Sequence, residues 1–171
     1  SDLSTIGATP IAITDCLNFG NPENPDIYYQ LKQCISGIST ASNKLNVPVI
    51  SGNVSLYNAN EEDNIFPTPI IGALGILDNI NNHVSNGFKN NNSIVILLGD
   101  SKISQLSSSL SGSEYLDKFY DKIMGNPQIN LDKELAVQTV CRSAIEKELL
   151  ESAHDCSDGG LLVCLAESCI I

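Results

Sequence analysis

The first half of the chain alternates apolar runs with polar segments rich in turn residues. Residues 10–16 predict a buried strand followed by a polar loop. Asn24, Pro25 and Asp26 are typical of a helix start, and apolar residues then recur every three or four positions until Asn46 and Pro48 end the pattern. Residues 47–51 and 69–77 predict two further strands. The order strand, helix, strand, strand predicts an α/β or α+β unit.

A polar, Asn-rich segment at residues 80–93 has no strong apolar period and predicts a boundary between residues 1–79 and 94–171. Beyond it, the apolar run 94–98 predicts a strand, and residues 101–131 are Ser-rich and weakly patterned. Two helices are expected after that: one over residues 132–151 with Asp132 as its cap, and one over residues 161–169 capped by Asp158.

Composition narrows the possible partners. The net charge of −11 disfavours nonspecific binding to nucleic acid or to an anionic membrane. With nine Lys and Arg in all, a phosphate site would need backbone N–H groups, a divalent metal or residues from elsewhere. Six cysteines, none in CxxC spacing, are expected to be reduced core residues of a cytoplasmic protein rather than metal ligands or disulfides.

The ends of the sequence predict a piece of a longer protein. The chain opens without Met and closes in the middle of an apolar pattern. No basic segment precedes an apolar one at the start, and no apolar run is long enough to span a bilayer.

Candidate chemistry lies at two predicted strand ends, where ligands bind in α/β folds. Asp15 could bind a metal or a nucleotide hydroxyl, and equally could cap a loop. After the second strand, Gly52 would let a ligand approach the backbone, the amide oxygen of Asn53 could ligate a hard divalent cation, and the Ser55 hydroxyl could donate to a phosphate or amide oxygen. An ordinary turn is the alternative, because Gly, Asn and Ser are common turn residues.

A third cluster contains His154, Asp155 and Asp158. A histidine beside two carboxylates is typical of metal binding or acid–base work. The alternative is structural, with Asp158 as a helix cap and His154 hydrogen-bonded within the fold. Neither a nucleophile elbow nor a P-loop motif is present in the sequence.

Several long motifs resemble one enzyme family. They are TDCLNFGNPENP at 14–25, VPVISGNVSLYN at 47–58, FPTPIIGALGIL at 66–77, GSEYL at 112–116 and AHDCSDGGLLVCLAES at 153–168. In this order they resemble the second structural half of phosphoribosylformylglycinamidine synthase. The motif sequences are nearer to those of the small bacterial type of this enzyme. The resemblance implies a partial aminoimidazole ribonucleotide synthetase-like fold. Residues 1–79 would be the later part of a barrel-forming N-terminal-type domain, 80–93 a linker, and 94–171 the start of a C-terminal-type domain.

The family reaction converts formylglycinamide ribonucleotide, ATP and glutamine-derived ammonia to formylglycinamidine ribonucleotide, ADP and phosphate. By motif matching, the resemblance implies that Asp15 and Gly52 contact ATP, Asn53 ligates Mg²⁺ and Ser55 contacts the ribonucleotide. It also implies a glutaminase subunit and a small accessory subunit as partners.

The rest of the family's active site lies outside this sequence, so the 171 residues alone are expected to be inactive. Two alternatives remain open: a half that binds nucleotide structurally without turnover, or another synthetase of the same superfamily. An open barrel-forming face would favour a homodimer of the isolated segment.

Overall fold

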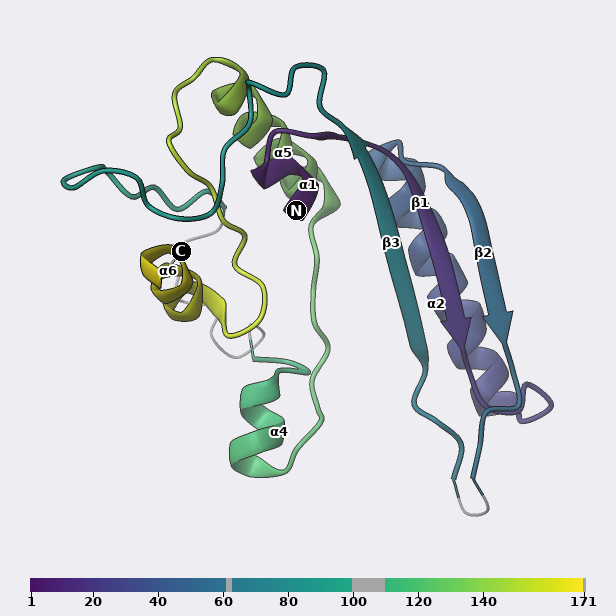
Figure 1. The fold of residues 1–171 in the computed structure, drawn as a ribbon. Coiled ribbons are helices and arrows are strands. Elements are labelled where there is room, and N and C mark those ends of the chain that lie inside the picture. The colour runs from purple at the N-terminus through teal and green to yellow at the C-terminus, as the bar shows by residue number, and fades with distance from the viewer. Residues whose placement is uncertain (61–62, 100–109, 171) are drawn as a thin grey trace. The chain divides into compact units, whose positions relative to one another are not determined.

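The computed structural model describes residues 1–60, 63–99 and 110–170. The chain divides into two compact units, whose elements Figure 1 shows. One, called here the sheet unit, is Ala8–Asp78; the other, the helical unit, combines Ser1–Gly7 with Asn79–Ile171. The division after Asp78 falls beside the Asn-rich segment, but residues 1–7 group with the later part of the chain.

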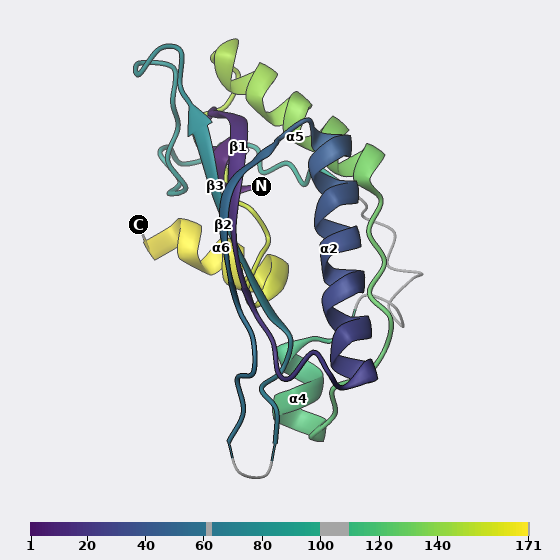
Figure 2. The same ribbon diagram turned by 90° about the vertical axis from the view of Figure 1, so that its right-hand side faces the viewer.

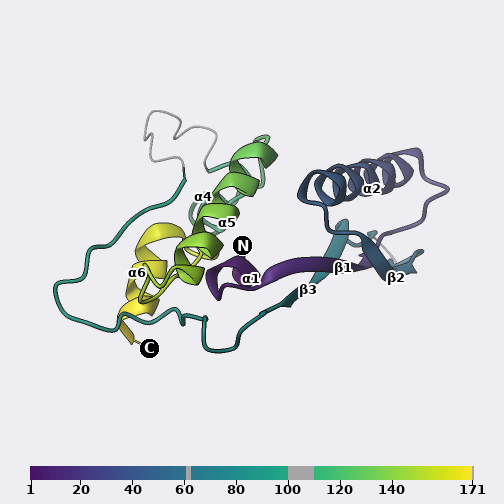
Figure 3. The same ribbon diagram turned by 90° about the horizontal axis from the view of Figure 1, so that it is seen from above.

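The sheet unit is a three-stranded mixed sheet with one long helix. Its elements are β1 (Thr9–Asn18), α2 (Pro25–Leu45), β2 (Val49–Ser55) and β3 (Thr68–Ile76). The strand order is β2-β1-β3, with β1 parallel to β2 and antiparallel to β3. Helix α2 runs along one face of the sheet (Figures 2 and 3). The predicted order of strand, helix, strand and strand is therefore confirmed.

The contact between α2 and the sheet forms the core of this unit. Leu17 and Phe19, in and just after β1, are buried together with Ile27 of the first turn of α2. Leu31, Cys34, Ile38 and Leu56 pack around them. These helix residues lie on the apolar stripe that the sequence predicts, so the stripe faces the sheet.

Both ends of α2 are fixed by asparagines, as the sequence predicts. The Asn24 Oδ1 atom accepts a hydrogen bond of 2.9 Å from the Asp26 amide, and Pro25 occupies the first helical position. At the other end Asn46 adopts a left-handed conformation with φ of 55° and stops the helix.

Replacing the cap by Asn24→Ala should loosen the first turn of α2. Losing an N-cap hydrogen bond costs about 1 kcal/mol, which corresponds to roughly fivefold faster local opening. Hydrogen exchange of the amides at 26–28 measures it. Gln33→Ala, on an exposed position of the same helix, is the control and should leave those amides unchanged. Unchanged exchange in Asn24→Ala would show that packing alone holds this end.

The helical unit contains four helices among the described residues. They are α1 (Asp2–Thr5), α4 (Glu114–Tyr120), α5 (Leu131–Glu146) and α6 (Gly160–Ile170). Helix α1 contacts α5, where Arg142 Nη1 donates a 2.8 Å hydrogen bond to Ser4 Oγ. In the described part of the chain, no helix combines the length and apolar character that crossing a membrane requires.

Several predictions for this unit are wrong. Residues 94–98 form no strand, because no strand among the described residues offers them a ladder of hydrogen bonds. Helix α5 is capped by Asn130 rather than Asp132, two residues earlier than expected: the Asn130 Oδ1 atom accepts a hydrogen bond of 3.0 Å from the Lys133 amide. It also ends at Glu146, short of residue 151. Helix α6 begins after Gly159, so Asp158 is not at the cap position.

Two further features depart from the sequence-based expectations. Helix α4, capped by Ser113, was not predicted because it lies in a weakly patterned region and buries no residue. The six cysteines are free and differ in exposure. Cys141 and Cys164 are buried, but Cys156 and Cys169 are exposed, so the prediction that the cysteines lie in the core is wrong for those two.

Candidate functional site at the paired strands β1 and β2

The candidate residues lie inside strands rather than in loops that follow them. Strand β2 continues to Ser55, and β1 continues past Asp15 to Asn18. In the parallel ladder, Asp15 pairs with Gly52, Cys16 with Asn53 and Asn18 with Ser55. The prediction that the second strand ends at residue 51 is therefore wrong, since pairing with β1 keeps these turn-forming residues extended.

The two faces of the sheet divide the candidate residues. Side chains alternate along a strand, so Asp15 and Gly52 belong to one face, and Asn53 and Ser55 to the other. The Asp15 face is the one that α2 covers. Asp15 borders a cavity of about 180 Å³ between sheet and helix. Its other lining residues are Leu17, Ile35, Ile38, Ser39, Ser42, Asn43 and Val49. The four residues thus share one stretch of the sheet but do not converge on one face.

Gly52 makes room for the carboxyl group of Asp15. A Cβ atom added at Gly52 would lie 2.8 Å from Asp15 Cγ and still closer to Oδ1. Real Cβ atoms do not approach other heavy atoms this closely, so an alanine would force Asp15 or the strands to move. The missing side chain therefore has a structural reason, in addition to any contact that the backbone of Gly52 makes with a ligand.

The face away from α2 carries a row of small polar side chains, called here the polar row. Thr14 Oγ1 donates to the Ser51 carbonyl oxygen at 3.0 Å, and Ser51 Oγ donates to Thr14 Oγ1 at 2.8 Å. The Asn53 amide is exposed, and among the described residues its Oδ1 accepts only a weak bond of 3.9 Å from the Cys16 thiol. That oxygen is therefore available to a ligand. The row comprises Thr14, Cys16, Asn18, Ser51, Asn53 and Ser55.

The Ser55 hydroxyl is already oriented by Asn58. Ser55 Oγ donates to Asn58 Oδ1 at 3.2 Å and lies 3.1 Å from Asn58 Nδ2. Asn58 Nδ2 also bonds the Ser55 and Phe19 carbonyl oxygens, at 2.9 and 3.1 Å. Asn58 thus ties the end of β2 to the end of β1. Sequence reasoning did not single out Asn58.

The other members of the polar row, Thr14, Cys16, Asn18 and Ser51, were also not singled out from the sequence. A signal for them exists: polar residues recur at every second position in both T-D-C-L-N and S-G-N-V-S. This period of two is typical of one strand face, and the register between the strands brings the two sets together.

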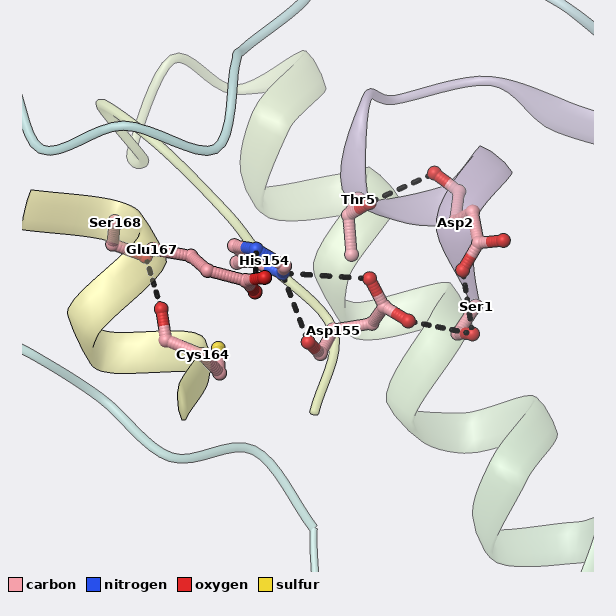
Figure 4. Close-up of polar contacts among 8 residues, drawn as sticks. All are labelled: Ser1, Asp2, Thr5, His154, Asp155, Cys164, Glu167 and Ser168. Carbon is pink, nitrogen blue, oxygen red and sulfur yellow. Dashed lines mark hydrogen bonds and ion pairs between the residues drawn. The ribbon is translucent and has the colours of Figure 1, made fainter. Parts of the chain in front are cut away.

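The third cluster lies in the helical unit (Figure 4). His154 Nδ1 lies 2.9 Å from the Asp155 carbonyl oxygen and 3.5 Å from Asp155 Oδ1, and His154 Nε2 lies 3.2 Å from Glu167 Oε2 of α6. Asp158 faces a cavity of about 360 Å³ that His154 and Glu167 also line. Sequence reasoning did not include Glu167, which joins the cluster only through the fold.

Asp155 is held as a carboxylate. Burial acts to raise the pKa of its carboxyl group, but hydrogen bonds involving Asp2, its own backbone and Ser157, together with the charge of His154, bring the pKa below its ordinary value. Among the described residues, no group of three or more His, Cys, Asp and Glu side chains is arranged to hold a metal ion. The contacts therefore favour the structural alternative for His154, as a link between its own turn and α6.

Two family models match the chain. The AIR synthase related protein N-terminal domain matches residues 1–77, and the AIR synthase related protein C-terminal domain matches residues 91–170. Together they take in most of the sequence, and the mixed α/β sheet unit agrees with them. The chain belongs to the AIR synthase related proteins, and the predicted fold class is confirmed.

Curated relatives narrow the match to one member of that class. Subunit PurL of phosphoribosylformylglycinamidine synthase from Anaeromyxobacter sp. Fw109-5 is 46% identical over 171 residues, which is 99% of this chain and 22% of that protein. PurL from Thermoanaerobacter pseudethanolicus is 45% identical over 170 residues, with the same coverage. The resemblance seen in the motifs is therefore confirmed. The chain spans about a fifth (22%) of the length of these relatives.

Solved structures of Thermotoga maritima proteins are also similar. The structure of PurLQS has 35% sequence identity to this chain and a TM-score of 0.45; the match covers 48% of this chain and 14% of the PurLQS chain. PurL complexed with ATP has 39% sequence identity and a TM-score of 0.39; the match covers 42% of this chain and 12% of the PurL chain.

Proposed function

We propose that this chain is part of an ATP-dependent ligase that makes formylglycinamidine ribonucleotide from formylglycinamide ribonucleotide, ATP and glutamine-derived ammonia. Similarity to PurL along 99% of the chain supports the proposal. The structural observation that carries it is the parallel pairing of β1 with β2, which brings Asp15, Gly52, Asn53 and Ser55 into one stretch of two adjacent strands.

The assigned roles follow the two faces. Asp15 would contact ATP from the α2 side of the sheet, and Gly52 would contact it through its backbone. On the polar row, Ser55 would donate its hydroxyl hydrogen to the ribonucleotide while Ser55 Oγ accepts the 3.1 Å hydrogen bond from Asn58 Nδ2. Asn58 would then fix the direction of that hydroxyl.

The residues fit Mg²⁺ only as part of a shared site. Asn53 supplies one neutral amide oxygen, while the Asp15 carboxyl belongs to the opposite face. Mg²⁺ commonly takes few protein ligands and completes its shell with phosphate oxygens and water, so one amide oxygen fits a metal that is bound together with ATP. When bound, Mg²⁺ supplies charge neutralisation for phosphoryl transfer.

The family resemblance also suggests the domain organisation and the partner subunits. We propose residues 1–79 as part of an N-terminal-type domain and 94–171 as the start of a C-terminal-type domain, which the family matches over 1–77 and 91–170 support. A cytoplasmic enzyme that works with a glutaminase subunit and a small accessory subunit is proposed on the same resemblance. A homodimer of the isolated segment is proposed from the exposed apolar side chains on β3, such as Ile70 and Leu74.

Ser55→Ala in the full-length protein tests the role assigned to the polar row. Loss of one hydrogen bond to the substrate should raise KM for formylglycinamide ribonucleotide about tenfold and leave KM for ATP unchanged. Steady-state kinetics with ammonia as the nitrogen source measure both constants. Ser51→Ala, on the same face of β2, is the matched control and should change neither. A rise in KM for ATP alone would assign Ser55 to the nucleotide instead.

The second candidate function is structural nucleotide binding without turnover. The position of Asp15 favours it, because its cavity lies between sheet and helix, away from the polar row. In that case Asp15→Ala would abolish tight nucleotide binding and lower thermal stability, while kcat of the protein that remains folded would be unchanged.

A further inference from the structure

Tyr57 has a backbone conformation that its side chain disfavours. Its φ of 60° lies in the left-handed region, which is unfavourable for a bulky residue. Among the described residues, the other non-glycine residues of this kind have an evident reason: three lie at or next to helix ends, and one is an asparagine in a turn. They are Asn46, Asp121, Glu148 and Asn92. Tyr57 ends no helix, and strain in such a residue persists mostly at functional sites.

The backbone contacts at this position need no side chain. The Tyr57 amide donates a 3.0 Å hydrogen bond to the Gly20 carbonyl oxygen, and the Asn58 amide donates one of 3.1 Å to the Phe19 carbonyl oxygen. These two bonds tie the chain after β2 to the chain after β1. A glycine at position 57 would make the same bonds without strain. The tyrosine side chain therefore has a role other than forming the turn.

The ring of Tyr57 also contributes little to the core of the sheet unit. Tyr57 is 60% exposed, whereas its neighbour Leu56 packs against the buried core. Tyr57 lies two residues after Ser55, the last residue of β2. The strained residue thus places an exposed phenol at the end of the strand pair that carries the proposed ribonucleotide contact.

The sheet unit supplies no cation to a phosphate group on the face of the polar row. Lys32 and Lys44 are the only Lys or Arg residues in the sequence of this unit, residues 8–78. Both belong to α2, which covers the opposite face of the sheet (Figure 2). A phosphate group bound at the polar row would therefore depend on neutral donors of this unit, besides any metal ion. Hydroxyl groups are such donors, and Tyr57 and Ser55 each carry one.

We propose that Tyr57 contacts the ribonucleotide, and that its phenolic O–H donates a hydrogen bond to the phosphate group. This inference rests on the proposed function, in which Ser55 contacts the same molecule. The tyrosine side chain is longer than that of serine, so the two hydroxyls can hold different groups of one ligand. The unfavourable backbone conformation is then a cost in stability that is retained for binding.

The test is isothermal titration calorimetry of the full-length protein with formylglycinamide ribonucleotide and with the riboside that lacks its phosphate. Tyr57→Phe should weaken ribonucleotide binding roughly 10- to 100-fold, because it removes a hydrogen bond to a charged group. Riboside binding should stay unchanged. Tyr29→Phe, which removes the hydroxyl of a similarly exposed tyrosine on α2, is the matched control and should bind both ligands as the wild type does.

A second variant separates binding from folding. Asparagine tolerates the left-handed conformation better than tyrosine and lacks the phenol. Tyr57→Asn should therefore leave hydrogen exchange of the amides at 57 and 58 unchanged or make it slower, while ribonucleotide binding weakens as in Tyr57→Phe. Faster exchange together with a lower Tm would make Tyr57 a structural residue and overturn the proposal.

Two results with Tyr57→Phe would also overturn the proposal. One is ribonucleotide binding as tight as that of the wild type. The other is equal weakening for ribonucleotide and riboside, which would place the contact away from the phosphate. Wild-type protein that does not bind the ribonucleotide would refute the proposed function, and this inference with it. The two failures are distinguishable, because only the first two results leave ribonucleotide binding by the wild type intact.

Discussion

Asn53→Ala in the full-length protein is expected to lower kcat/KM for formylglycinamidine ribonucleotide synthesis by about 100-fold or more. Removing groups that only orient a metal ligand lowers metal affinity or activity 10- to 100-fold in many sites. Loss of an oxygen that binds the metal directly should lower activity at least as much. Steady-state kinetics at saturating and limiting Mg²⁺ measure it. Excess Mg²⁺ should restore part of the activity, because the phosphate oxygens of ATP would still hold the metal.

The same substitution should barely change stability. Asn53 is exposed, and its oxygen accepts only the 3.9 Å contact from the Cys16 thiol within the part of the chain that the structure describes. Its loss should therefore change the free energy of unfolding by no more than about 0.5 kcal/mol. Asn53→Asp keeps an oxygen at this position and is the conservative control, with most activity retained. Loss of activity together with loss of folding in Asn53→Ala would make Asn53 a structural residue instead.

Gly52→Ala is expected to loosen the pairing of β1 with β2. The added Cβ would lie 2.8 Å from Asp15 Cγ, and overpacking of this kind costs about 1–3 kcal/mol. Hydrogen exchange of the β1 and β2 amides in the full-length protein should therefore become roughly 5- to 150-fold faster. Gly37→Ala in α2 is the matched control, since nothing lies within 4 Å of its added Cβ. It should leave the strand amides unchanged.

A second substitution separates packing from ligand contact. If Asp15 causes the strain, Gly52→Ala combined with Asp15→Ala should return strand exchange nearly to the level of Asp15→Ala alone. If Gly52 also contacts ATP, the double variant should recover its stability but keep a raised KM for ATP. Exchange that stays fast in the double variant would mean that the backbone of β2, rather than the Asp15 carboxyl, meets the new methyl group.

Local signals in the sequence were enough to predict α2. The cap at Asn24, the proline after it and the stop at Asn46 each act through neighbouring backbone groups, so the residues themselves determine the ends of the helix. The apolar stripe likewise predicted which side of α2 faces the sheet. The family motifs predicted the fold class, which the matches to both domain models confirm.

Features that depend on distant pairing could not be predicted in this way. Gly52 and Asn53 favour turns by intrinsic preference, yet the ladder with β1 keeps them in a strand. The run at 94–98 has strand-like composition but no partner strand among the described residues. The separation of Asp15 from Asn53 onto opposite faces follows from strand register, which no single segment encodes.

The measurement that tests the proposed site most directly is a crystal structure of the full-length protein with Mg²⁺ and a non-hydrolysable ATP analogue. We expect Asn53 Oδ1 at about 2.1 Å from an Mg²⁺ ion that also binds phosphate oxygens, with the nucleotide in contact with the backbone of Gly52. Nucleotide and metal bound elsewhere, with Asn53 still in contact only with the Cys16 thiol, would contradict the assignment.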